Sequence, residues 1–300
     1  MVTPRDPEEV TTNASAVEAK LPADTTMGPV HLTVSDLERS LDYYRRTIGI
    51  DVLEEGPGKA SLGTGSTELL ALVEEPGTQP AVGYTGLYHF ALLVPERRDL
   101  ARWLAHAARN RVSLVGLSDH FVSEAIYLSD PDRHGIEIYA DRPREVWEGR
   151  VGERLTTMPL DVDSLLGELD DPASEPFDGL HAGTVMGHLH LKVAAIPSTI
   201  EFYRDVLGFG LTAALGLQAA FFGAGGYHHH VGGNTWESAG APAPPQGSAA
   251  LRHATVVLPN SRERDELVQR ASAAGHEPED TPEGPVVGDP SGNRLVLTHA

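Results

Sequence analysis

The sequence predicts an α+β protein built from four βαβββ modules that form two tandem domains. Two observations support this fold class. A segment of alternating apolar residues followed by a helical apolar repeat occurs four times along the chain, and the first pair of copies matches the second pair at residue level. The 300 residues and the apolar fraction of 40% are sufficient for two ordinary cores. The domains are expected at residues 27–142 and 184–300.

The first module begins with an alternating strand at residues 30–34, which leads into a helix. The segment from Ser35 to Glu38 has the Ser-x-x-Glu pattern of a capping box and is expected to start that helix. Apolar residues at helical spacing continue to Ile48, and Gly49 is expected to end the helix. Further strands are expected around Val52, Leu62 and Leu70.

The other three modules repeat this order. Their first strands are expected at residues 87–94, 187–193 and 252–259. Residues 40–50 align without a gap with residues 199–209, so that Tyr44 corresponds to Tyr203 and Gly49 to Gly208. A second capping-box pattern runs from Ser198 to Glu201. The second half of the chain is therefore interpreted as a copy of the first.

Segments outside the modules are expected to be loops. Residues 1–26 are polar and lack apolar periodicity, which predicts a flexible N-terminal tail. Residues 143–183 are acidic and contain proline, which predicts a solvated connector with one short helix near Asp163 to Leu169. Residues 239–247 are rich in Ala and Pro and are expected to form a second loop. Neither the connector nor this loop is expected to contribute to catalysis.

Composition limits the functions that the chain could have. The formal net charge of -20 argues against a nucleic-acid partner. No apolar run approaches the roughly 18 residues that a membrane span needs, and no signal-peptide pattern is visible, so a cytoplasmic protein without membrane contacts is expected. The chain has no cysteine, which leaves histidine and carboxylate side chains as the expected metal ligands.

One segment differs between the two copies in a way that matters chemically. Residues 127–137 are interpreted as a strand, a turn that begins with Asp-Pro, and a second strand that contains Glu137. The corresponding segment, residues 286–297, has a similar turn, but Val296 stands at the position of Glu137. A carboxylate that is present in one copy and absent from the other points to a chemical role for Glu137.

With these features the chain resembles the vicinal oxygen chelate superfamily of glyoxalases, bleomycin resistance proteins and extradiol dioxygenases. The resemblance rests on the histidine-containing first strands and on the turns that begin with Asp-Pro. The run from Gly226 to Trp236 is similar to the catechol 2,3-dioxygenase group within it. The resemblance implies paired modules that form cup-shaped mixed sheets around a divalent metal. It also implies that Fe(II), or less often Mn(II), serves to open a catechol ring with O₂.

The resemblance further implies where the metal ligands lie. The first-strand positions for histidine ligands hold Pro29, His89, His188 and His253. Family members usually draw two histidines and a glutamate from the third and fourth modules, but that pair lacks the glutamate here. A complete set, His89, Glu137 and His188, arises only if the second module faces the third. Modules one and four would then form a metal-free cup. Two imidazoles and one carboxylate on one face leave metal positions open for substrate and O₂.

Three residues near this site are given catalytic roles by resemblance. A family tyrosine lies ten residues before the metal-binding glutamate, and Tyr127 has that spacing from Glu137. His229 matches a family pattern for an acid/base histidine, which would take a proton from the catechol and return one during ring opening. His120 is expected to be a further donor near the site, although its spacing departs from the family pattern.

Several histidines keep more than one interpretation. His190 shares a strand face with His188 and competes with it as a ligand. His253 occupies a ligand position without a carboxylate partner and is interpreted mainly as a remnant of duplication. The run from His228 to His230 is interpreted either as a surface tract or as a metal-binding cluster of its own, apart from the role of His229. The residues expected to contact the substrate are His190, Asn234 and Trp236, the last by stacking on an aromatic ring.

The predicted function is extradiol cleavage of a catechol-type aromatic by O₂ with Fe(II), with Mn(II) as the alternative metal. The expected partners are a small aromatic diol, O₂ and further copies of the chain in a homo-oligomer. Two alternatives stay open. One is another metalloenzyme of the superfamily, such as a glyoxalase-like lyase or an isomerase, which would need a second carboxylate. The other is a metal-free small-molecule-binding protein, which would not need His89, Glu137 and His188 together.

Overall fold

A computed structural model describes residues 19–300 of the chain. None of the helices in this range has the length and apolar character that a membrane span requires. Most of the tail expected at residues 1–26 lies outside the described residues. Residues 19–26 pack onto the domain instead. Leu21 is buried, and the backbone N–H groups of Lys20 and Leu21 both donate to the carbonyl oxygen of Gly208. The expectation of a flexible tail is therefore wrong for this last part.

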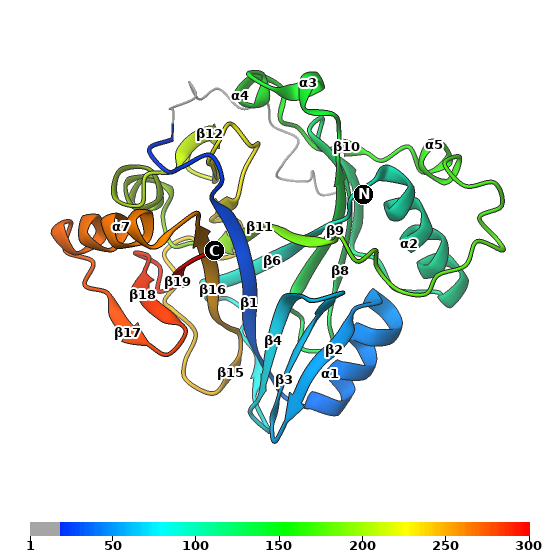
Figure 1. The fold of residues 1–300 in the computed structure, drawn as a ribbon, viewed down its shortest axis with the longest axis horizontal. Helices are drawn as coiled ribbons and strands as arrows, with labels where there is room; N and C mark the ends of the chain where they lie inside the picture. Colours follow the sequence, from blue (N-terminus) through cyan, green and yellow to red (C-terminus); the bar gives the residue numbers. More distant parts are fainter. Residues whose placement is uncertain (1–18) are drawn as a thin grey trace.

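Two large curved mixed sheets dominate the molecule (Figure 1). The strand order of the first is β17-β18-β19-β16-β1-β4-β3-β2, which joins the first module to the fourth. Its strands are β1 (Thr26–Val34), β2 (Asp51–Gly56), β3 (Lys59–Thr64), β4 (Thr67–Glu74), β16 (Leu251–Leu258), β17 (Glu279–Thr281), β18 (Gly284–Gly288) and β19 (Arg294–His299).

The second sheet has the order β10-β7-β8-β9-β6-β11-β14-β13-β12, which joins the second module to the third. Its strands are β6 (Gly86–Leu93), β7 (Gly116–Asp119), β8 (Ser123–Ser129), β9 (Gly135–Asp141), β10 (Met158–Pro159), β11 (Val185–Lys192), β12 (Gly210–Leu215), β13 (Ala219–Gly223) and β14 (Val231–Asn234). A small separate pair consists of β5 (Gln79–Pro80) and β15 (Ser248–Ala249). The predicted pairing of modules is confirmed.

The strand register supports the comparison of Glu137 with Val296. In the second sheet, β9 lies parallel to β6 and places Glu137 beside Ala91, two residues after His89. In the first sheet, β19 lies parallel to β16 and places Val296 beside Thr255, two residues after His253. Glu137 and Val296 therefore hold equivalent positions in the two sheets.

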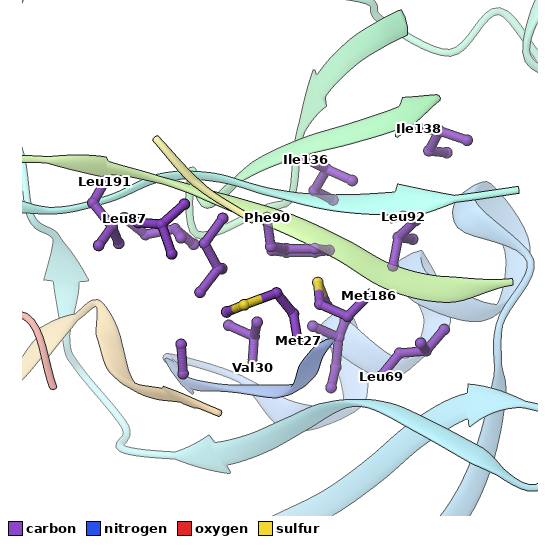
Figure 2. Packing of buried hydrophobic residues seen from close by; sticks show 14 of the residues in the cluster. Met27, Val30, Leu69, Leu87, Phe90, Leu92, Ile136, Ile138, Met186 and Leu191 are labelled. Atoms are coloured by element: carbon purple, nitrogen blue, oxygen red, sulfur yellow. The ribbon is translucent and has the colours of Figure 1, made fainter. Parts of the chain in front are cut away.

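The main core lies between the two sheets. Figure 2 shows Met27 and Val30 of the first sheet facing Phe90 and Met186 of the second, and all four are buried. Successive side chains of a strand point to opposite faces of its sheet. Because Phe90 points into this core, its neighbour His89 points to the other face of the second sheet.

The longer helices follow the first strands of the modules, as predicted. They are α1 (Leu37–Tyr43), continued by the π-helical turn η1 (Tyr44–Ile48), α2 (Arg97–Asn110), α6 (Ile196–Ile200), continued by η2 (Glu201–Val206), and α7 (Ser261–Ala273). Gly49 and Gly208 follow the first and third of these helices with φ of 87° and 90°. That left-handed conformation favours glycine, which explains why both copies have it there.

Both predicted capping boxes are wrong. The N-cap of α1 is Asp36, whose side chain accepts from the backbone N–H of Arg39. Ser35 instead donates its hydroxyl to Asp132 at 2.6 Å, a contact that local sequence does not reveal. The N-cap of α6 is Ala195, so Ser198 lies inside the helix.

An equivalent buried hydrogen bond occurs in each half of the chain. The Tyr44 hydroxyl donates to Asp130 at 2.9 Å, and the Tyr203 hydroxyl donates to Asp289 at 3.2 Å. In each case a tyrosine from the helix of an odd-numbered module reaches the turn before the last strand of the next module. The repeat seen in sequence is thus also a repeat of buried polar contacts.

The connector is more structured than predicted. Besides the expected short helix, α5 (Val162–Leu166), it contains α3 (Arg144–Trp147), α4 (Val151–Arg154) and strand β10. Trp147, Val151 and Leu155 are buried against Phe221 of β13. Their spacing of four residues is helical, and this signal in the sequence could have identified the segment. Residues 239–247 form a loop, as predicted.

Candidate metal centre

Three adjacent central strands bring His89, Glu137 and His188 together. They come from β6, β9 and β11, and their side chains project to the face opposite the main core. The Nε2 atoms of His89 and His188 each lie 3.0 Å from Oε2 of Glu137. All three residues are at most 4% exposed. Among the described residues, this is the only group of three or more histidine and carboxylate side chains whose ligand atoms all lie within 4.8 Å of one another.

The donor set fits a divalent metal. His188 makes a hydrogen bond with Oε2 of Glu137, whereas Nε2 of the buried His89 has no hydrogen-bond partner despite lying close to the same oxygen. A buried polar atom without a partner is costly, and a metal ion would satisfy it. Nitrogen and oxygen ligands in this combination suit Fe(II) and Mn(II).

The ionisation of the group also suits a metal. Burial alone would raise the pKa of Glu137, but the imidazoles of His188 and His89 hold that pKa well below its usual range. Burial lowers the pKa of His188, although the Glu137 carboxylate opposes this effect. The carboxylate is therefore ionised and the imidazole neutral, which are the forms that bind metals.

A small cavity of about 30 Å³ lies at these three residues, with room for roughly two water molecules. Of the predicted site residues, His120, Tyr127, His190 and His229 line it. Sequence reasoning missed the other lining residues, which are Ser123, Leu155, Thr156, Thr157, Leu215 and Phe221. Three of them belong to the connector, which therefore forms part of the cavity wall.

Tyr127 and His120 act as a pair. Tyr127 lies directly across from Glu137 in the antiparallel strands β8 and β9. Its hydroxyl is 2.6 Å from Nε2 of His120, while Nδ1 of His120 is 2.9 Å from the carbonyl oxygen of Thr156. Because a carbonyl only accepts, Nδ1 carries a hydrogen, and Nε2 is left as the partner of the Tyr127 hydroxyl. His120 thereby orients the hydroxyl of Tyr127.

A hydrogen-bond chain presents His229 to the cavity. Asp141 lies 2.9 Å from Nε2 of His228, and Nδ1 of His228 lies 2.8 Å from Nδ1 of His229. The carboxylate accepts from Nε2–H of His228, which leaves Nδ1 of that ring to accept from Nδ1–H of His229. This arrangement leaves Nε2 of His229 with its lone pair. Burial lowers the pKa of His229 well below its usual range, which keeps the ring neutral.

The run from His228 to His230 is not a surface tract, because all three rings are buried. It is also not a separate metal-binding cluster, because the only group of three or more close potential metal ligands within residues 19–300 is that of His89, Glu137 and His188. Nδ1 of His230 accepts from the backbone N–H of Ala224, and burial lowers the pKa of His230 to about 3. Of the three rings, only that of His229 lines the cavity.

Of the three residues expected to contact the substrate, only His190 lines the cavity. His190 lines the cavity opposite His89, with ring centroids 5.0 Å apart, but it is not part of the ligand group. Asn234 and Trp236 do not line the cavity. The Trp236 ring packs on Tyr88 and His190, and Oδ1 of Asn234 accepts from the backbone N–H of Trp236. The prediction that these two contact the substrate gains no support from their positions.

The equivalent face of the first sheet holds a histidine pair. His253 lies across from His31, with ring centroids 3.9 Å apart, and Pro29 and Val296 occupy the remaining ligand positions. This group does not converge as a metal site within residues 19–300. Burial, followed by the charge of His31, lowers the pKa of His253 to about 4, with Glu283 opposing and Arg252 and Arg294 assisting.

We expect His253 to make stability depend on pH. An unfolded histidine titrates near ~6.5, so between about pH 6.5 and 4 the unfolded chain binds a proton that the folded chain excludes. The contribution is present above that window and is lost as the pH falls through it. Melting temperatures at about pH 7 and pH 4.5 should differ less for His253→Gln than for the unaltered protein. Equal differences in both proteins would contradict this assignment.

Two curved sheets of paired βαβββ modules, one of them with a buried His, Glu and His group, define the architectural class. The model of the Glyoxalase/Bleomycin resistance protein/Dioxygenase superfamily matches residues 26–138 and 185–297, and the chain belongs to that superfamily. The predicted family and fold class are therefore confirmed.

Comparison with individual proteins gives closer relatives. A catechol-2,3-dioxygenase of Bacillus subtilis (strain 168) is 42% identical over 273 residues, which cover 89% of this chain and 94% of that protein. A metallothiol transferase FosB of Staphylococcus epidermidis is 30% identical over 116 residues, which cover 36% of this chain and 80% of that protein. Among solved structures, glyoxalase I from Zea mays superposes with a TM-score of 0.56 at 16% identity, over 92% of both chains.

Proposed function

We propose that this protein is a metal-dependent extradiol dioxygenase that cleaves a catechol-type aromatic with O₂. The observation that carries the proposal is the convergence of His89, Glu137 and His188 in a cavity that Tyr127 and His229 also line. The similarity to a catechol-2,3-dioxygenase over most of both chains supports the same reaction.

His89, Glu137 and His188 would hold the metal, for which we propose Fe(II), with Mn(II) as the alternative. When bound, the metal would supply coordination positions for the catechol and O₂, and the catechol itself would supply the electrons that reduce O₂. The cavity walls contributed by Leu155, Leu215 and Phe221 are apolar and keep bulk water from the reacting groups.

Side chains of the protein accept and return the proton of the catechol hydroxyl. Nε2 of His229 accepts a proton from a catechol hydroxyl and returns one during ring opening, which suits a neutral imidazole. The hydroxyl of Tyr127, oriented by His120, is placed to hydrogen-bond an oxygen of the substrate beside Glu137. His190 bounds the cavity and restricts where the aromatic ring can lie.

Both alternative functions are less well supported. A lyase or isomerase of this superfamily would use a second carboxylate, and Glu137 is the only carboxylate among the described residues that line the cavity. A metal-free binding protein would leave Nε2 of His89 without a partner, at a cost in stability.

The test is to load protein purified without air with Fe(II) or Mn(II), and then to add catechol and air. A yellow ring-opened product is expected from the loaded protein and none from protein treated with a chelator. No absorbance change with a panel of catechols would contradict the proposal.

Metal binding should also raise thermal stability, since an ion that binds the folded state at 100 times its Kd adds about 2.7 kcal/mol to the free energy of unfolding. Calorimetry of chelator-treated and reloaded protein under nitrogen measures this directly. The expected increase in melting temperature should be absent in Glu137→Gln. An equal increase in both proteins would place the metal elsewhere.

A further inference from the structure

A second, larger pocket of about 310 Å³ adjoins the metal cavity, and His89 and Tyr127 line both. The metal cavity itself has room for roughly two water molecules, which is too little for an aromatic ring with a substituent. The larger pocket is therefore where the part of a substrate beyond the two hydroxyls can extend. Its lining decides which substituents fit.

Two cations, Arg133 and Lys192, line this pocket together with one carboxylate, Glu237. Neither Arg133 nor Lys192 forms an ion pair within residues 19–300, and Nζ of Lys192 reaches only the carbonyl oxygen of Ala81, at 3.4 Å. Burial lowers the pKa of Lys192, and the Glu237 carboxylate opposes this shift. Glu237 is the only carboxylate in the lining, so positive charge is in excess. That excess is notable in a chain with a net charge of -20.

Arg133 is also held in a backbone conformation that favours glycine. Its φ is 67°, and it lies in the turn between β8 and β9. The equivalent turn between β18 and β19 has Gly292 at the same position, with φ of 85°. Both turns make the same backbone hydrogen bond, from Arg133 to Asp130 and from Gly292 to Asp289, at 3.0 Å in each case.

Comparison of the two turns indicates a role for the arginine side chain. Gly292 adopts the positive φ of its turn without strain, because glycine has no Cβ. Arg133 adopts a similar φ, which residues with side chains rarely occupy. Strained residues of this kind persist mainly where their side chains have a function. The copy with arginine is the one that lines the larger pocket beside the metal cavity.

We propose that Arg133 and Lys192 form an anion-binding subsite that holds a carboxylate on the substrate, so that catechols with an acidic side chain are preferred. This inference rests on the proposed dioxygenase function and deepens it. A guanidinium group can bind a carboxylate through two parallel hydrogen bonds, and the half-buried ammonium group of Lys192 adds a second charge.

The test compares two ligands of the same shape, 3,4-dihydroxyphenylacetate and its uncharged amide, on the iron-loaded protein without air. Dissociation constants are measured by titration, so the readout does not depend on turnover. We expect the acid to bind about tenfold more tightly than the amide, which is the scale of one charge-assisted hydrogen bond. Arg133→Gly and Lys192→Met should each reduce that preference, and added salt should weaken it.

Arg111→Gly is a matched control. Arg111 also has positive φ, at 54°, but it ends helix α2 and does not line the pocket. Its replacement relieves the same kind of strain and should leave the preference for the acid intact. Arg133→Gly should keep its melting temperature or raise it by a few degrees, which excludes unfolding as the cause of weaker binding.

The outcomes separate the two proposals. Equal affinity of the unaltered protein for acid and amide, with both cleaved once air is admitted, overturns the anion subsite and leaves the dioxygenase function standing. An unchanged preference in both Arg133→Gly and Lys192→Met also overturns it. If the iron-loaded protein neither binds nor cleaves the acid, the amide or catechol itself, the proposed function fails, and this inference fails with it.

Discussion

Replacement of Glu137 by Gln should remove the metal and the ring-cleaving turnover together. The carboxamide has nearly the same shape but no charge, and it is a poor ligand for a divalent ion in a site that is 2% exposed. Loss of residues that merely support metal ligands costs 10–100-fold in affinity, so loss of this ligand should cost more than ~100-fold. Metal content after anaerobic loading and the yellow product after air is admitted are the two measurements.

The duplicated fold offers a matched control for this experiment. His89 and His253 hold equivalent positions in the two sheets, but the neighbouring strand supplies Glu137 to His89 and Val296 at the same position in the other sheet. His89→Gln should lose the metal as Glu137→Gln does, whereas His253→Gln should retain it. Full metal occupancy and turnover in Glu137→Gln would show that the proposed centre is wrong.

Replacement of His229 by Gln should reduce kcat by ~10²–10⁴-fold, which is the usual contribution of a positioned acid or base. The metal content should not change, because the metal ligands are elsewhere. Stopped-flow measurement of product formation at saturating catechol separates this loss from weaker binding. Turnover within twofold of the unaltered protein would exclude His229 as the acid/base.

Asp141→Ala tests the hydrogen-bond chain that presents His229. Without the acceptor at 2.9 Å, His228 is no longer held with its Nδ1 as acceptor, and His229 can adopt the other tautomer. We expect a smaller loss of about tenfold in kcat, with a shifted pH profile. His230→Gln is the control, because this neighbouring ring bonds Ala224 and does not line the cavity. It should lower stability without a comparable loss of kcat.

The arrangement of the centre could be predicted because the chain contains two copies of the same unit, and equivalent positions in the two copies can be compared. One copy has Glu137 where the other has Val296, and one has His188 where the other has Pro29. Only one pairing of modules therefore completes a ligand set. The sheet order has this pairing. Strand alternation then places His89 and His188 on one face and Phe90 and Leu189 on the other.

What could not be predicted depends on contacts distant in sequence. Ser35 fits a capping box locally, but its hydroxyl binds Asp132 from the adjacent module. The connector looks like an acidic loop, yet Leu155, Thr156 and Thr157 line the cavity because Trp147 packs against the third module. Asn234 and Trp236 follow a histidine run that supplies one ring to the cavity, but they lie beyond it. Side-chain packing of this kind leaves little trace in local pattern.

The three proposed ligands lie on β6, β9 and β11, so they lose conformational entropy when the protein folds and not when a metal binds. Each lies within a strand that is hydrogen-bonded on both sides at the middle of the second sheet. Their backbones are therefore ordered when the sheet forms, and an arriving ion does not have to organise a loop. The same rigidity keeps a buried carboxylate beside two imidazoles whether or not an ion is present. The affinity for an ion is therefore not reduced by the entropy cost of ordering its ligands.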